Sequence, residues 1–308
     1  MDTILDAKYL PFTEELLLDH FAKVRYRGQC IRNERHRNYY RNSLRRYHAY
    51  LADNPDLRGK PLSEMSRPCQ VEKDERFWVA SCMMTIFHND LREQMLQELF
   101  TLAYGNTPPL TKLDSWEDCL GGDLKLFFEA NLPSPLLYKE WLLQNLRQRH
   151  FIPHILSSAY GKRYLEGPTH VDAILINPSN GFAVVVEAKL LSDISYQITY
   201  DVTRNQIARI IDVMLEQNNR LCEPLSKRDP DGTLFLLLTP EIFKTYPSHR
   251  LYGYKFNDYK KNPESIASDL PHRKDRAWRE VSNRLGWLTW EDFHKINENC
   301  CPGLLRVP

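Results

Sequence analysis

Residues 169–190 read THVDAILINPSNGFAVVVEAKL, and this stretch decides the fold. Apolar residues fill His170–Asn177 and again Phe182–Leu190, while the turn-forming residues of Pro178–Gly181 stand between them. Two apolar runs separated by a short turn predict a β-hairpin. Because both arms are apolar almost throughout, we expect them to be interior strands of a sheet.

Charged side chains stand where the two arms come together. Asp172 opens the first arm, and Glu187 and Lys189 close the second. Alternation places Glu187 and Lys189 on one face, and antiparallel pairing brings Asp172 close to them. Two carboxylates at the end of an apolar sheet are costly unless a hard divalent cation compensates them, so the cluster predicts a Mg²⁺ site at which Mn²⁺ could substitute. The alternative is a surface salt bridge of Lys189 with either acid at a frayed sheet end.

The flanking sequence predicts a mixed α/β (α+β) fold. Apolar residues recur at helical spacing in Pro135–His150 and in Thr203–Gln217. Thr233–Thr239 is wholly apolar and is typical of a central strand, while Phe151–Ser157 is a candidate short strand. The expected order is therefore helix, three strands, helix, strand. A helical C-terminal extension should follow, with helices near Pro263–Leu270, Asp275–Leu285 and Thr289–Ile296.

At these residues the chain resembles the PD-(D/E)XK nuclease superfamily, which has the restriction-endonuclease-like fold. The resemblance covers roughly residues 135–240 and implies an αβββαβ core. It also implies that Asp172, Glu187 and the backbone carbonyl of Ala188 bind the metal, with Lys189 as the catalytic lysine. The implied reaction is metal-dependent hydrolysis of phosphodiester bonds, in which a water attacks in line with the leaving oxygen.

Members of this superfamily often add an acidic residue from the first helix of the core. Glu140 is the matching candidate here, as both a catalytic residue and a metal ligand, and Glu129 is a weaker one because it precedes the break at Pro133–Pro135. One position departs from the family pattern, since Val171 stands where the superfamily has a proline before the aspartate.

Polar residues on the helix after the second hairpin arm often face the site in this superfamily. Here that helix begins Thr203-Arg204-Asn205-Gln206. Arg204 and Gln206 at a helix N-terminus would meet a phosphate, helped by the free backbone amides there. The alternative is an ordinary solvated first turn.

A strongly basic segment lies near the N-terminus. Residues 23–50 carry nine Lys or Arg against Glu34 alone, a net charge of +8, with five tyrosines interleaved. Guanidinium groups pair with phosphates and aromatic rings stack on bases, which favours nucleic acid as the partner. The alternative is a solvated face of a helix over Asn33–Leu51. The expected nucleic-acid contacts in this segment are Arg32, Arg35, Arg37, Arg41, Arg45 and Arg46.

The chain divides most clearly at Gly105–Pro109. We expect residues 1–108 to form a helical, basic, nucleic-acid-binding region and residues 109–308 to form the nuclease domain. Helices are expected over about Leu10–Arg25 and over Asp74–Tyr104, with Thr13 or Phe12 near the first cap.

Composition narrows the setting in which the protein works. The 308 residues contain no apolar run near the roughly 20 residues that a membrane helix needs. Acidic residues in Met1–His20 exclude a signal peptide, and seven scattered cysteines do not indicate a disulfide framework. We therefore expect a cytoplasmic protein with no membrane partner.

The leading hypothesis is a Mg²⁺-dependent endonuclease or exonuclease that acts on DNA. One alternative is a nuclease of the same fold that acts on RNA, although nothing in the sequence is typical of 2′-hydroxyl recognition. Another is a catalytically silent nucleic-acid-binding or assembly subunit. Cutting both strands with one site per chain would favour a homodimer.

Overall fold

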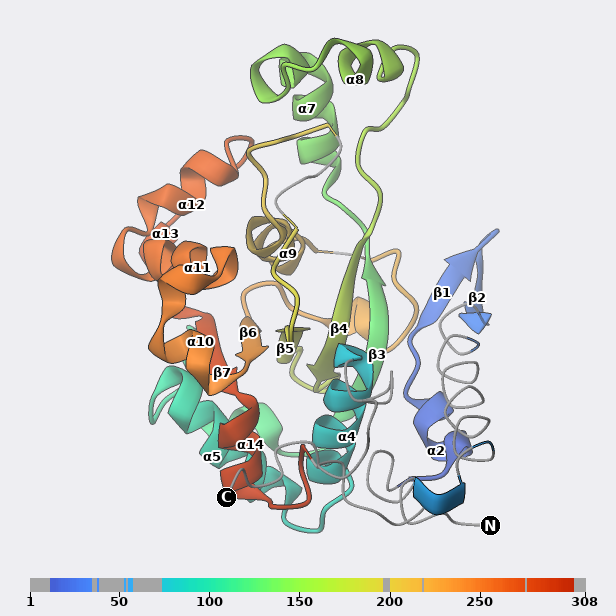
Figure 1. Ribbon diagram of the computed structural model, residues 1–308, viewed down its shortest axis with the longest axis vertical. Helices are drawn as coiled ribbons and strands as arrows, with labels where there is room; N and C mark the ends of the chain where they lie inside the picture. Colours follow the sequence, from blue (N-terminus) through green and yellow to red (C-terminus); the bar gives the residue numbers. More distant parts are fainter. Residues whose placement is uncertain are drawn as a thin grey trace.

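The computed structural model describes residues 12–34, 38, 53, 55–57, 74–195, 200–217, 219–274 and 276–301. Its centre is a mixed sheet in the order β3-β4-β5-β6-β7 (Figure 1). The two pairs β3–β4 and β4–β5 are antiparallel, whereas β5–β6 and β6–β7 are parallel. The predicted α/β class and the predicted hairpin are confirmed. The strands are β3 (Lys125–Leu132), β4 (Thr169–Ile176), β5 (Ala183–Ala188), β6 (Thr233–Thr239) and β7 (Leu285–Thr289).

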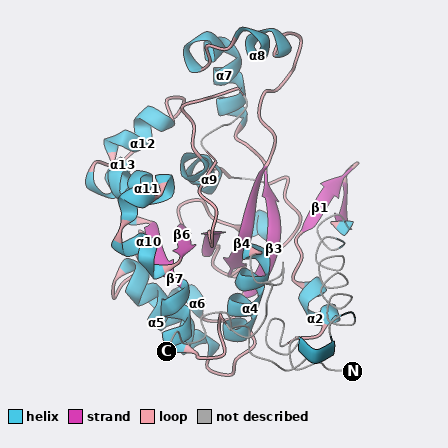
Figure 2. Ribbon diagram, viewed as in Figure 1, coloured by secondary structure: helices cyan, strands magenta, loops and turns pink. Residues whose placement is uncertain are grey.

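Helices cover both faces of this sheet (Figure 2). Every residue of β5 and β6 is buried, because alternate side chains enter one apolar cluster on each face. The first cluster contains residues of α2 (Glu14–Asp19), α4 (Glu75–Phe87), α5 (Arg92–Tyr104), α6 (Trp116–Leu120) and α14 (Trp290–Ile296). The second contains residues of α9 (Gln206–Met214), α11 (Leu251–Lys261), α12 (Glu264–Asp269) and α13 (Trp278–Asn283).

The order of elements differs from the prediction in two respects. The predicted helix over Pro135–His150 exists as α7 (Leu136–Arg149), but it lies between the first and second strands, β3 and β4, and not before them. The strand predicted over Phe151–Ser157 is wrong: this segment forms helix α8 (Pro153–Ser158), with Pro153 in the first turn, where proline is well tolerated. Figure 1 shows α7 and α8 projecting beyond the sheet.

The first helix is shorter than predicted. Thr13 caps α2 by accepting a hydrogen bond from the N–H of Leu16, as expected, but the helix ends at Asp19 and not near Arg25. A hairpin follows, made of β1 (Lys23–Tyr26) and β2 (Gln29–Arg32). Its turn has positive φ at Arg27 and Gly28, which is the geometry of a type I′ turn. Most of the helix predicted over Asn33–Leu51 lies outside the described residues.

The helical stretch predicted over Asp74–Tyr104 is confirmed as two helices, α4 and α5, and Asp74 caps the first of them. The remaining elements are η1 (Pro55–Leu57), η4 (Leu225–Lys227), α10 (Glu241–Thr245) and η5 (Pro247–His249).

One core spans the expected division at residues 108 and 109. The apolar cluster of α4 and α5 continues directly into β3–β7, and the Tyr104 hydroxyl donates a 2.7 Å hydrogen bond to the Phe235 carbonyl oxygen. Helices α4 and α5 are therefore structural parts of the layer that covers the sheet.

Cysteine pairing differs from the sequence expectation. Cys30 pairs with Cys222, and Cys82 with Cys301, in two disulfides, while Cys119 and Cys300 are buried free thiols. The cysteines therefore no longer support the expectation of a cytoplasmic protein. Among the described residues, no helix is both long and apolar enough to cross a membrane.

Candidate functional site

The acidic residues of the hairpin lie on neighbouring strands. Ala173 of β4 pairs with Val186 of β5, so Asp172 and Glu187 occupy the next positions outward in the same register. The N–H of Ala188 donates a 2.7 Å hydrogen bond to Asp172 Oδ2. Glu187 is only 2% exposed, whereas Asp172 is half-buried. The structure thus brings together the two carboxylates that the sequence singled out.

A break in side-chain alternation occurs beside Asp172. Phe128 and Ala130 of β3 enter clusters on opposite faces although they are two residues apart, and Ala173 and Val171 of β4 do the same. Between Phe128 and Ala130 stands Glu129, whose φ of 52° costs a non-glycine residue about 1–3 kcal/mol. The pairing register of β3 and β4 is the same before and after Glu129, so the break changes the face that side chains enter without adding a residue to either strand. Glu129 lies close enough to influence the charge of Asp172.

Lys189 lies among the carboxylates. Its Nζ donates a 2.6 Å hydrogen bond to Glu187 Oε1 and stands 3.7 Å from Glu75 Oε2. Gln206, the first residue of α9, donates from Nε2 to the same Glu187 oxygen at 2.5 Å. Gln206 therefore reaches the site, although through a carboxylate.

Burial and crowding perturb these charges. Burial raises the pKa of Asp172 well above its ordinary value, and the neighbouring Glu187 raises it further. Burial also raises the pKa of Glu187, although Lys189 opposes the shift. Burial alone would lower the pKa of Lys189, but Glu187 and Asp172 outweigh it and raise that pKa above its ordinary value. The ammonium of Lys189 therefore stays protonated at neutral pH.

The cluster carries an excess of negative charge. Four carboxylates influence one another, and among the described residues two cations contact them: Lys189, and Arg76, whose Nε lies 3.3 Å from Glu129 Oε1. With these two cations, four ionised carboxylates have a net charge of −2, which one divalent cation would balance. The carboxylates are those of Glu75, Glu129, Asp172 and Glu187.

The carboxylates of Asp172 and Glu187 also fit such an ion in their bonding. Among the described residues, Asp172 Oδ1 and Glu187 Oε2 accept no hydrogen bond, so each acid keeps one oxygen for another ligand. Within the same ranges, no three His, Cys, Asp or Glu side chains converge as a ready-made metal-binding group. A cation here would therefore depend on water ligands as well, as Mg²⁺ usually does.

The helix that supplies an acid to this site is α4 and not α7. Glu75 is the first residue of α4, and besides Lys189 it accepts a hydrogen bond from the Ser192 hydroxyl. Glu140 is exposed on α7 and makes none of the contacts described at this site, because α7 belongs to the projecting segment between β3 and β4. Asp74-Glu75 at the start of an apolar helix was the sequence signal that could have identified Glu75.

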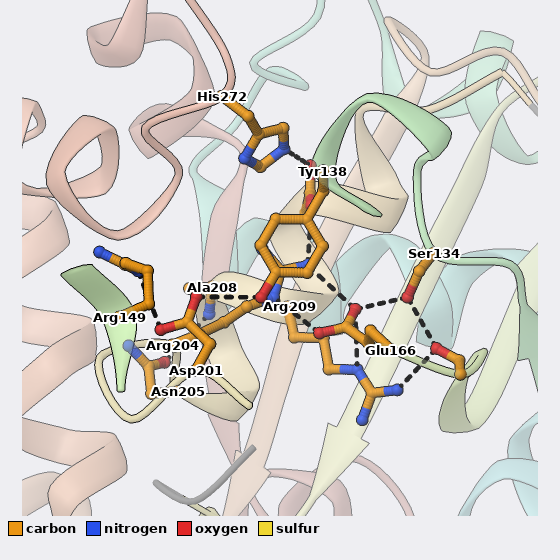
Figure 3. Close-up of polar contacts among 12 residues, drawn as sticks. Ser134, Tyr138, Arg149, Glu166, Asp201, Arg204, Asn205, Ala208, Arg209 and His272 are labelled. Atoms are coloured by element: carbon orange, nitrogen blue, oxygen red, sulfur yellow. Dashed lines mark hydrogen bonds and ion pairs between the residues drawn. The ribbon is translucent and has the colours of Figure 1, made fainter. Parts of the chain in front are cut away.

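Arg204 does not face the site. Its side chain is fully buried, with Nη2 at 2.7 Å from Asp212 Oδ2, Nε at 3.1 Å from Glu166 Oε2, and Cζ at 3.6 Å from the ring centre of Tyr138 (Figure 3). Burial alone would lower the pKa of Arg204, but Asp212 and Glu166 raise it. The predicted phosphate contact by Arg204 is therefore wrong: this guanidinium is a structural cation.

Part of the predicted basic surface is described. Arg32 is exposed on β2, as are Lys23, Arg25 and Arg27 around the same hairpin. The N–H of Arg25 Nε donates a 2.8 Å hydrogen bond to the carbonyl oxygen of Arg220, so the hairpin is tied to the main body. The other expected contacts, Arg35, Arg37, Arg41, Arg45 and Arg46, lie outside the described residues.

No family model matches this chain, and no match was found among curated proteins or among solved structures. The chemistry of the acidic cluster is therefore the basis for assigning a function.

Proposed function

We propose that this protein is a metal-dependent nuclease that hydrolyses phosphodiester bonds, with DNA as its substrate. The observation that carries the proposal is the pair Asp172 and Glu187, side by side on β4 and β5, each with one carboxylate oxygen that accepts no hydrogen bond from the described residues. A buried excess of negative charge is costly, and a divalent cation would remove the cost.

Asp172 and Glu187 would hold the cation, and the carbonyl of Ala188 is the third ligand expected from the resemblance. Bound there, Mg²⁺ or Mn²⁺ would withdraw charge from the scissile phosphate and lower the pKa of a water. Gln206 holds Glu187 Oε1 in place by its hydrogen bond, which leaves Oε2 oriented for the ligand. Hydrogen bonds from Ala188 and Gln206 thus orient the carboxylates of Asp172 and Glu187 before the ion binds.

Lys189 would act as a cation and not as a base. Its raised pKa keeps the ammonium protonated, so it can donate hydrogen bonds to a phosphate oxygen that gains negative charge. Glu75 also lies close to this ammonium and would hold it in position when a phosphate approaches. In the reaction, the oxygen of water bonds to phosphorus, the ester bond to the leaving oxygen breaks, the attacking water gives a proton to solvent, and the leaving oxygen takes up a proton from solvent.

The exposed cations around the β1–β2 hairpin support a polyanionic substrate. Lys23, Arg25, Arg27 and Arg32 stand there with Tyr26, which is itself exposed. Phosphate backbones bind such surfaces through charge, and aromatic rings add contacts to bases.

The test is cleavage of labelled DNA and matched RNA with Mg²⁺ by the wild type, Asp172→Asn and Glu187→Gln. We expect the wild type to cut DNA and both variants to lose activity. As a matched control, Glu98→Gln changes an exposed acid on α5 and should cut like the wild type. Equal cutting by Asp172→Asn and the wild type would overturn the proposal. If the wild type cuts RNA and not DNA, the proposed substrate becomes RNA.

A further inference from the structure

The segment between β3 and β4, residues 133–168, folds as a small unit that we call the α7–α8 insertion. It has its own apolar cluster, to which Tyr200 from the segment after β5 contributes. Figure 1 shows it projecting beyond the end of the sheet. The buried members of the cluster are Tyr138, Leu142, Ala159, Leu165 and Tyr200.

Buried polar contacts fix the base of the insertion (Figure 3). The Tyr138 hydroxyl donates a 2.9 Å hydrogen bond to Asp201 Oδ2, and Arg149 Nε donates one of 3.0 Å to Asp201 Oδ1. On the other side, Glu166 pairs with the buried Arg204. Buried charges are tolerated only when their partners are well placed, so these contacts hold the insertion in one position.

The insertion is connected to the candidate site by the chain itself and by these contacts. Its two ends continue into β3 and β4, the strands that carry Glu129 and Asp172. Asp201 belongs to the chain between Lys189 and α9, the helix that begins with Gln206. A ligand on the insertion would therefore lie on an element joined rigidly to the site.

The surface of the insertion exposes aromatic rings. Phe151, just before α8, is 77% exposed, and Tyr160, just after it, is 94% exposed. Neither ring is buried in the small apolar cluster of the insertion. A large aromatic side chain that is exposed contributes little to folding, so both rings are free to contact a ligand.

Exposed cations outnumber exposed carboxylates on the insertion. Arg147, Lys162 and Arg163 are exposed and Lys139 is half-buried, against a single exposed carboxylate, that of Glu140. Lys139 Nζ and Arg163 Cζ lie 5.0 and 5.1 Å from the ring centre of Tyr164. Aromatic rings among cations are typical of surfaces that bind single-stranded nucleic acid, because the rings stack on bases while the cations follow the phosphates.

We propose that the α7–α8 insertion binds an unpaired stretch of the substrate, with bases stacked on Phe151 and Tyr160 and phosphates near Arg147, Lys162 and Arg163. A base-paired duplex keeps its base faces inside the stack, so exposed rings select strands with unpaired bases. This inference rests on the proposed function and specifies its substrate class: nucleic acid with a single-stranded segment, such as an overhang or flap. The excess of positive charge on the surface of the insertion favours nucleic acid over a protein partner, because nucleic acid carries a negative charge at every phosphate.

The test compares binding of a labelled duplex with a single-stranded overhang and of the blunt duplex. It uses the full chain, in EDTA and again with Ca²⁺. For Phe151→Ala/Tyr160→Ala we expect overhang binding to weaken at least about 30-fold, the effect of losing two stacked bases, while blunt-duplex binding changes less than about twofold. The matched control is Leu102→Ala, since Leu102 is 58% exposed on α5, outside the insertion.

A spectroscopic readout separates stacking from general apolar contact. In an overhang that carries 2-aminopurine, binding of the wild type or of Tyr160→Phe should quench the fluorescence of this base. Binding of Tyr160→Leu should quench it much less. Because Tyr160 is almost fully exposed, this single change leaves the fold intact even where the double variant does not.

The outcomes distinguish this inference from the nuclease proposal. Equal binding of overhang and blunt duplex by the wild type, or unchanged overhang binding by the double variant, overturns the stacking role and leaves the nuclease in place. Selective loss of overhang binding supports the stacking role even if Asp172→Asn still cuts DNA, the result that overturns the nuclease. Absence of binding to any nucleic acid overturns both.

Discussion

Asp172 Oδ2 accepts a 2.7 Å hydrogen bond from the backbone N–H of Ala188. The last backbone pair between β4 and β5 is Ala173 with Val186, so beyond this pair a carboxylate of β4 continues the hydrogen bonding to β5. This contact orients Oδ2 and leaves Oδ1 for another ligand. The same residue therefore has a structural and a proposed catalytic role, which substitutions can separate.

Replacing Asp172 with asparagine should abolish cleavage and stabilise the fold. The amide oxygen can still accept the hydrogen bond of Ala188, while the negative charge that Glu187 repels is lost. We expect activity to fall at least about 100-fold. Replacing a residue that only contacts a metal ligand already lowers metal affinity or activity by about 10–100-fold. We expect Tm in EDTA to rise by about 2–4 °C for each kcal/mol of relieved repulsion. Calorimetry and cleavage assays measure both, and a lower Tm would contradict the charge argument.

Glu75 and Glu140 should differ in their effect on metal dependence. Glu75 lies 3.7 Å from Lys189 and interacts with Glu187, whereas Glu140 is exposed on α7. We expect Glu75→Gln to raise the Mg²⁺ concentration for half-maximal cleavage by about 10-fold, within the range for residues that contact metal ligands, and Glu140→Gln to leave it unchanged. A Mg²⁺ titration of the two variants measures the difference. The reverse result would restore the acid that the sequence favoured.

Lys189 and Glu187 should be coupled in stability. Removing one partner of a buried ion pair leaves the other uncompensated, so Lys189→Met should lower the free energy of unfolding by about 3–5 kcal/mol. Adding Glu187→Gln should recover much of that loss without recovering cleavage. Denaturant unfolding of the two single variants and the double variant measures the coupling. Strictly additive effects would show that the pair contributes nothing as a unit.

The metal-free protein should lose stability as the pH rises. The pKa values of Asp172 and Glu187 are raised above their ordinary values of 3.8 and 4.5, so the unfolded chain releases these protons first. Their stabilising contribution is complete below about pH 4 and is lost as the pH rises through the raised pKa values. The Tm advantage of Asp172→Asn/Glu187→Gln over the wild type in EDTA should therefore grow between about pH 4 and pH 8. Saturating Mg²⁺ should reduce this growth, and a pH-independent advantage would refute the assignment.

Arg204 should affect folding and not phosphate contacts. It is buried between Glu166 and Asp212, so Arg204→Met should lower the free energy of unfolding by about 3–5 kcal/mol. The salt dependence of DNA binding should be unchanged in the folded variant, whereas Arg32→Ala, which removes an exposed cation of β2, should reduce the slope by about 1. Binding titrations at several salt concentrations measure the slopes. A reduced slope for Arg204→Met would return this residue to the interface.

Much of the central sheet could be predicted from the sequence. The hairpin of β4 and β5, the buried strand β6 and helix α9 follow from periodicity and turn residues within short windows. Strand β3 could also have been predicted, because Lys125, Glu129 and Asn131 alternate with apolar residues, but the break at Glu129, which is part of the site, has no signal in that pattern. Phe151–Ser157 was assigned wrongly because a short apolar run has no periodicity that separates strand from helix.

The sequence by itself determined the local geometry that brings Asp172, Glu187 and Lys189 together, because strand alternation and a short turn act within about twenty residues. Only the tertiary structure decided which further residues join them. Arg204 and Gln206 are two positions apart at the start of α9, yet Arg204 is buried against Glu166 while Gln206 contacts Glu187. The reason is that the direction in which a helix terminus faces is set by packing against elements distant in the chain, which no local pattern encodes.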